Sequence, residues 1–195
     1  MSQTIILATH NQNKLREVRQ ILSSLNINVL GADDCHLPDI EETGTTFEEN
    51  AKLKAIAGFK ATGKPVIADD SGLCISAMND MPGLYSARYA KKHGGYPAVF
   101  DVINKEIGDN PNRSAHYTCV MAIAYSETEV YTFTGYLHGK IAKTASGTGG
   151  FGYDPIFIPE GYDTTLGHIS ADEKNKISHR GKALEQLYTF LKQKQ

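Results

Sequence analysis

The sequence of 195 residues contains no tryptophan, only three cysteines and no large excess of charge of either sign. The cysteines lie far apart and form no C-x-x-C pair, so we expect free thiols in a reducing compartment and no disulfide framework. Lysine and arginine are scattered, and the formal net charge is −2, which argues against DNA or RNA as a partner.

Long hydrophobic runs are also missing. The first apolar segment is too short for a signal peptide, and no later segment approaches the length of a membrane span. We therefore predict a cytoplasmic protein with no membrane and no nucleic-acid partner. The remaining composition, 41% hydrophobic and 22% charged, is typical of a globular protein, and we predict a single domain over residues 1–195, large enough to form two joined lobes.

Hydrophobic periodicity predicts an α/β protein. Short apolar runs predict strands, apolar residues at helical spacing predict helices, and the capping box Thr46–Glu49 marks one helix start. Helices alternate with strands early in the chain and strands cluster late, which favours a mixed sheet. The predicted strands are 4–8, 27–30, 66–68, 116–125, 130–141 and 156–159, and the predicted helices are 15–25, 47–62, 97–107 and 175–192.

Two glycine-rich stretches look like nucleotide-binding motifs but fail on their context. Gly147, Gly149 and Gly152 have the G-x-G-x-x-G spacing of a dinucleotide-binding turn, yet Pro155 follows where a helix would have to begin. The stretch 58-GFKATGKP-65 is one residue short of a Walker motif and ends a helix instead of starting one. We therefore expect neither an NAD or FAD site nor a P-loop.

Two adjacent aspartates, Asp69 and Asp70, follow the predicted strand 66–68 directly. Carboxylates close to a core are costly unless a partner compensates them, and a divalent metal is one such partner. Glu41 and Glu42 offer further oxygens, and a carboxylate-only set suits Mg²⁺ or Mn²⁺ better than Zn²⁺. Because side chains alternate along a strand, we expect Asp69 to face away from a metal held by Asp70. The alternative is that all these acids are solvated loop charges.

The junction between the first strand and the first helix could bind an anion. Thr9, Asn11 and Lys14 lie there, where backbone amides and the helix dipole favour negative charge. Simple helix capping by Asn11 or Asn13 uses the same geometry and stays an alternative.

A third group of polar residues occurs late in the chain. Lys174 precedes 178-SHRG-181, in which His179 and Arg180 could bind a phosphate or donate to a base edge. A surface His-Arg pair that contacts only solvent is the alternative.

Six stretches together resemble the Ham1 family of pyrophosphatases for non-standard purine nucleoside triphosphates, also called inosine triphosphate pyrophosphatases or XTP/dITP diphosphatases. The resemblance implies a long curved mixed β-sheet with flanking helices, two lobes around a central cleft, and a homodimer. The stretches follow the family order across nearly the whole chain: ILATHNQNKLREV, EETGTTFEENAKLKA, VIADDSGL, PGLYSARY, GTGGFGYDPIF and EKNKISHRGKAL.

The same resemblance implies roles for single residues. Glu41 and Asp70 match the Mg²⁺ ligands, with Mn²⁺ as a substitute, and Asp70 also matches the proton acceptor. The glycines of the late loop would let Phe151 or Tyr153 stack on a base. The residues that match the triphosphate- and substrate-binding set are Thr9, His10, Asn11, Gln12, Asn13, Lys14, Lys54, Ser71, Phe151, Gly152, Tyr153, Asp154, Lys174, His179 and Arg180.

The implied reaction is NTP + H₂O → NMP + diphosphate, which removes ITP, dITP and XTP from the nucleotide pool. Arg180 or His179 would donate toward O6 and N7 of the purine and meet a repelling amino group in adenine. This chain departs from the family pattern at His10, where glycine is common, and over 90–102, where an acidic stretch is usual. A Maf-like pyrophosphatase for standard or modified pyrimidine nucleotides and a non-catalytic nucleotide-binding module are the alternatives.

Overall fold

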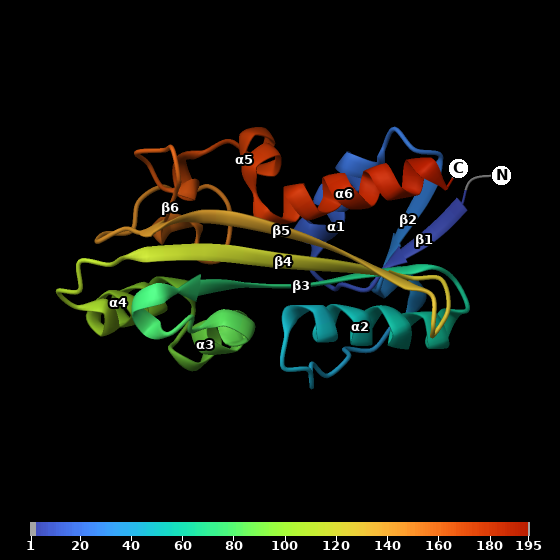
Figure 1. The fold of residues 1–195 in the computed structure, drawn as a ribbon, viewed down its shortest axis with the longest axis horizontal. Coiled ribbons are helices and arrows are strands. Elements are labelled where there is room, and N and C mark those ends of the chain that lie inside the picture. Colours follow the sequence, from blue (N-terminus) through green and yellow to red (C-terminus); the bar gives the residue numbers. More distant parts are fainter. Residues whose placement is uncertain (1–2, 195) are drawn as a thin grey trace. The chain divides into compact units, whose positions relative to one another are not determined.

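A computed structural model describes residues 3–194 and shows an α/β fold (Figure 1). The strands are β1 Gln3–Leu7, β2 Ile27–Gly31, β3 Val66–Ile75, β4 Ser114–Ala124, β5 Val130–Ile141 and β6 Phe157–Pro159. The α-helices are α1 Gln12–Leu22, α2 Phe47–Thr62, α3 Ser86–Lys92, α4 Tyr96–Ile107, α5 Ala171–Ile177 and α6 His179–Gln193.

The strands form one sheet in the order β2-β1-β3-β4-β5-β6. Strand β1 pairs in parallel with β2 and β3, whereas β5 and β6 are antiparallel. The predicted α/β class and mixed sheet are therefore confirmed.

The chain divides into two compact units. The first runs to Asp70 and includes Cys119–Thr134 and the chain from Lys182 on; the second comprises Ser71–Thr118 and Gly135–Gly181. A single domain over 1–195 stays a prediction, and residues 1, 2 and 195 of that range lie outside the described part. The central cleft also stays a prediction.

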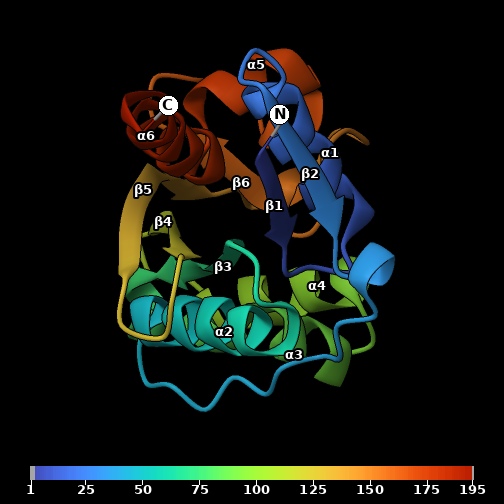
Figure 2. The ribbon, with the colours of Figure 1, turned by 90° about the vertical axis from the view of Figure 1, so that its right-hand side faces the viewer.

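The first unit has helices on both faces of its strands, as Figure 2 shows for α1 and α6 on one side and α2 on the other. Alternation along β4 explains this arrangement. Cys119, Met121 and Ile123 belong to the core that contains α1 and α6, whereas Ala122 and Ala124 belong to the cluster of α2. The burial of both faces accounts for the continuous apolar run Cys119–Ala124 in β4.

The second unit has its own core, built around α4. Val99 and Ile103 of this helix are fully buried in a cluster that also contains Tyr117 of β4, Tyr153 and Phe157. The loop before β6 is thus attached to a packed core. No helix within residues 3–194 has both the length and the apolar character needed to cross a bilayer.

Three local predictions were wrong. Strand β3 continues through Asp69 and Asp70 to Ile75, so the aspartates lie within the strand and not after it. The predicted helix 175–192 is two helices that meet at Ser178, where Gly181 approaches the backbone so closely that a β-carbon would lie 1.8 Å from the Asn175 carbonyl oxygen. Helix α3 was not predicted.

Candidate functional site

Strand β3 carries the two aspartates into the first unit's interior. Asp69 is 4% and Asp70 5% exposed, so the alternative of solvated loop charges is wrong for this pair. Consecutive strand residues point to opposite faces, and each carboxylate therefore needs its own compensation. The structure supplies different partners to the two.

Asp70 is held by a neutral amide. Asn50 on α2, itself buried, donates from Nδ2 to Asp70 Oδ2 at 2.9 Å. Burial raises the pKa of Asp70 to about 6, although the positive charge of Lys54 and the Asn50 hydrogen bond act to lower it. A carboxylate with a pKa in this range is ionised at neutral pH and still basic enough to take a proton from water.

Lys54 lies one helical turn after Asn50, on the same face of α2. Its Nζ contacts Glu42 Oε1 at 2.6 Å. Burial acts to lower the pKa of Lys54, but the charges of Asp69, Asp70 and Glu42 outweigh it, so the pKa is raised. Lys54 thus stays protonated among three carboxylates.

Asn50 was missed by the sequence analysis. The sequence contained a signal for it: Asn50 is a polar residue four positions before Lys54, on the helix face that also carries the small residues Ala51, Ala55 and Gly58.

The carboxylate of Asp70 is chemically suited to bind a hard divalent cation. Within residues 3–194, no three His, Cys, Asp or Glu side chains are grouped to share a metal ion. The carboxylate of Asp70 is nonetheless the ligand type of Mg²⁺, and a cation beside it would offset the burial that raises its pKa, whereas Asn50 faces Asp70 with its Nδ2 and accepts from the Gly44 amide with its oxygen. The predicted second ligand, Glu41, is exposed.

Asp69 forms an ion pair with the first turn of α1. Lys14 Nζ lies 2.7 Å from Asp69 Oδ2, and the Lys14 side chain is mostly buried. The Lys14 ammonium group is thus a charged partner of Asp69. The contact places a lysine beside the N-terminus of α1, as an anion site requires.

Residues 9–13 arrange the same turn. Asn11 caps α1 by accepting from the amides of Asn13 and Lys14, so the capping interpretation of Asn11 is confirmed. His10 Nδ1 lies 2.6 Å from Asp33 Oδ1, and this hydrogen bond raises the pKa of His10.

Two other predicted residues are held in this turn. Gln12 also donates to Asp33, and the Thr9 hydroxyl accepts from the Asn11 amide. His10 and Gln12 therefore link the turn to the segment after β2.

The second unit gathers the late group of predicted residues around Phe151. Asp154 Oδ2 accepts from the Phe151 amide at 2.7 Å and from Lys174 Nζ at 2.6 Å. Burial raises the pKa of Asp154, against the opposing charge of Lys174. Gly150 has φ 71°, and a β-carbon there would lie 2.0 Å from the carboxylate, so this turn requires glycine.

Phe151 has cations over its ring. Lys174 Nζ lies 4.1 Å and the Arg180 guanidinium 5.6 Å from the ring centroid. Tyr153 is only 3% exposed, and its hydroxyl donates to the Ser86 carbonyl at 2.7 Å. Of the two aromatic rings predicted to stack on a base, Phe151 is therefore the one that remains accessible.

Helix α6 begins with two buried polar residues. His179 stacks on Tyr117 with ring centroids 4.6 Å apart and planes at 7°. Arg180 donates from Nη2 to Ser71 Oγ at 3.4 Å. The alternative of a solvent-exposed His-Arg pair is wrong, since both side chains are buried.

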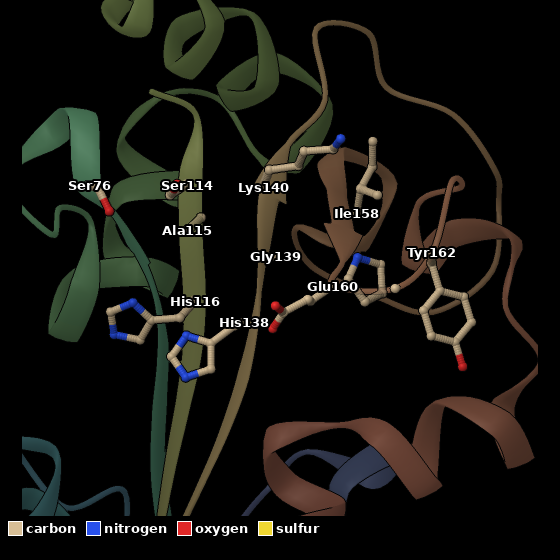
Figure 3. Close-up of a pocket in the computed structure, with 12 residues that line it drawn as sticks. Ser76, Ser114, Ala115, His116, His138, Gly139, Lys140, Ile158, Glu160 and Tyr162 are labelled. Atoms are coloured by element: carbon tan, nitrogen blue, oxygen red, sulfur yellow. The ribbon is translucent and has the colours of Figure 1, made fainter. Parts of the chain in front are cut away.

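A separate pocket of about 550 Å³ also lies in the second unit. His116 and His138, with Lys140 and Glu160, are among its lining residues (Figure 3). None of the predicted site residues lines this pocket, so it is not part of the candidate site.

The comparisons with known proteins agree with one another. A family model described as the Ham1 family matches residues 5–190. The chain is 45% identical to a dITP/XTP pyrophosphatase of Streptomyces coelicolor, over 97% of each chain, and 47% identical to one of Oceanobacillus iheyensis, over 96% of this chain and 97% of that protein. A solved HAM1 protein from Coxiella burnetii is similar with a TM-score of 0.92 and 42% identity, over 98% of this chain and 99% of that chain.

Proposed function

Because the chain belongs to the Ham1 family, we propose that it hydrolyses non-standard purine nucleoside triphosphates such as dITP, XTP and ITP to the monophosphate and diphosphate. It is accordingly a hydrolase of acid anhydride bonds. The observation that supports this most directly is Asp70, a buried carboxylate with a pKa near 6 and two lysines in the same cluster.

The first unit supplies groups suited to the triphosphate. Asp70 would orient a water molecule and accept its proton as the oxygen attacks the α-phosphorus. Lys14 and Lys54 would offset the phosphate charges, and Asp69 would hold the Lys14 ammonium in place. The start of α1 and the side chains of residues 9–13 would bind phosphate oxygens, because the helix dipole favours negative charge there.

A divalent cation completes this proposal. Asp70 and Glu41 would hold Mg²⁺, with Mn²⁺ as a substitute, and the bound ion would neutralise charge on the leaving diphosphate. Glu42 is paired with Lys54, which favours Glu41 as the second ligand.

The second unit supplies groups suited to the base. Phe151 would stack on the purine, and His179 and Arg180 would donate toward O6 and N7. Adenine presents an amino group at the same position, so a buried donor there would be left without an acceptor. The remaining members of the proposed set are Ser71, Gly152, Tyr153, Asp154 and Lys174.

We further propose that the enzyme acts in the cytoplasm as a homodimer, without a nucleic-acid partner. The family resemblance supports the dimer, and size-exclusion chromatography with light scattering would test it.

A diphosphate-release assay over ITP, XTP, dITP, GTP, ATP and UTP tests the activity. We expect the first three to be hydrolysed fastest. Preference for UTP would indicate the Maf-like alternative, and no release from any nucleotide would indicate a non-catalytic module. Either result would overturn the proposed function.

A further inference from the structure

The segment 90–102, where this sequence departs from the family pattern, starts helix α4 in an unusual way. Gly94 and Gly95 have φ of 88° and 100°, values that favour glycine, and Pro97 occupies the first turn of the helix. Tyr96 is the first residue of α4. This double-glycine turn therefore determines the position of Tyr96 at the start of α4.

The ring of Tyr96 contacts the loop that carries Phe151. A β-carbon built on Gly152 would lie 3.6 to 3.8 Å from Tyr96 Cε1, Cζ and Oη, an ordinary van der Waals distance, so the ring lies beside this glycine. Tyr96 also meets the Tyr153 ring edge to face, with centroids 5.1 Å apart and planes at 90°. Such T-shaped pairs are a favoured aromatic geometry.

This contact depends on the ring and not on a hydrogen bond. Among residues 3–194, the Tyr96 hydroxyl forms no hydrogen bond, and the residue as a whole is 36% exposed. Burial, followed by the charge of Asp154, raises the pKa of Tyr96, so the phenol stays neutral in the physiological range. Phenylalanine should therefore replace tyrosine at this position.

Loop 150–154 is thus attached at two places. Asp154 accepts from the Phe151 amide and from Lys174, and Tyr96 packs on Tyr153 and lies beside Gly152. Gly152 has φ 67° and no side chain of its own to restrain it. Without the Tyr96 ring, the residue next to Phe151 would be free to move.

We propose that Tyr96 is a positioning residue for base recognition: its ring fixes Gly152 and Tyr153, and thereby the orientation of Phe151. This inference rests on the proposed function, in which Phe151 stacks on the purine. It predicts weaker binding of the nucleotide with little change in the chemical step, because Asp70 belongs to the other unit.

The test compares Tyr96→Ala with Tyr96→Phe and a matched control, Tyr131→Ala. Tyr131 is 37% exposed and also packs on aromatic rings, but it lies in the first unit. We expect Tyr96→Ala to raise KM for ITP and the Kd for IMP by roughly tenfold, the equivalent of one aromatic pair. The kcat should stay close to that of the wild type, the preference for ITP over ATP should fall, and Tyr96→Phe should restore all three.

Equal KM values for Tyr96→Ala and Tyr131→Ala would overturn the role of Tyr96, and so would a Tyr96→Phe variant as impaired as Tyr96→Ala. Thermal unfolding of the two alanine variants measures the loss of packing alone. Wild-type enzyme inactive on every nucleotide would overturn the proposed function itself, whereas an active wild type with an unaffected Tyr96→Ala variant would overturn only the present inference.

Discussion

The charged groups of the two units have different partners. In the first, charged groups compensate one another closely: Lys14 with Asp69, and Lys54 with Glu42, beside Asp70. The second unit also has one close pair, Lys174 with Asp154, but there Lys174 and Arg180 lie over the Phe151 ring as well. A phosphate group is recognised by charge and a base by its ring face and edge, so the contrast supports the proposal that the triphosphate binds the first set and the base the second.

The buried carboxylates of the two units show the same contrast. Burial raises the pKa of both Asp70 and Asp154. Asp154 accepts from the ammonium of Lys174 and from a backbone amide, which makes it an anchor for a loop. Asp70 accepts from the neutral amide of Asn50 and keeps a pKa near 6, which suits it to proton transfer.

Removal of divalent metal should reduce activity more than any substitution. It should affect the groups of the first unit and leave base binding by the second unit unchanged. We expect EDTA to reduce diphosphate release to background and Mg²⁺ to restore it, because the proposed ligands are oxygens. Binding of IMP, followed by calorimetry, should change little, since the base groups belong to the second unit. Full activity in EDTA would refute the metal requirement.

Asp70→Asn should be the most damaging single substitution. The amide keeps the shape of the carboxylate but cannot accept the proton, so kcat for ITP should fall by about 10²- to 10⁴-fold. Asp69→Asn should do less damage, because Asp69 pairs with Lys14 and is not the base. Circular dichroism would check folding. Equal losses in the two folded variants would contradict this division of roles.

Arg180→Ala should weaken base choice more than catalysis. A side-chain donor gains a hydrogen bond to O6 of ITP but has no acceptor when ATP is bound. The difference corresponds to roughly tenfold to hundredfold discrimination. The ratio of kcat/KM for ITP to that for ATP should therefore collapse. Arg180→Lys is the informative control, because it keeps the charge but loses the planar fork. If Arg180→Ala lowers kcat/KM for both nucleotides equally and Arg180→Lys restores both, Arg180 contacts phosphate instead.

The limits of prediction also differ between the units. Local sequence patterns predicted the positions of most helices and strands, and the order of the motifs identified the family. Both kinds of signal lie in short stretches of sequence. The partners of Asp69 and Asp70 were not predictable, since an ion pair with Lys14 joins residues 55 positions apart. Likewise, nothing local distinguishes Tyr153, which is buried against Ser86, from the accessible Phe151. The break at Ser178 goes with the close approach of Gly181 to the Asn175 carbonyl, a contact that apolar residues at helical spacing do not reveal.

The smallest expected effect concerns stability, and it separates the two buried carboxylates most cleanly. The folded-state pKa of Asp70 is raised from 3.8 to about 6. Its contribution to stability is therefore fully present below pH 3.8, where the group is protonated in both states, and is lost as the pH rises through 6. In metal-free protein at pH 7.5, Asp70→Asn should increase the free energy of unfolding by about 1–3 kcal/mol.

The gain in Asp70→Asn should shrink toward pH 4, which urea unfolding in EDTA at both pH values would measure. Asp154→Asn should behave oppositely at pH 7.5, although burial raises the pKa of Asp154 as well. Replacing Asp154 leaves the buried Lys174 ammonium without its carboxylate, and an uncompensated buried charge destabilises the fold. We distinguish Asp70, a carboxylate that destabilises the fold when charged, from Asp154, which anchors a loop. A shift of stability in the same direction for both variants would contradict this distinction.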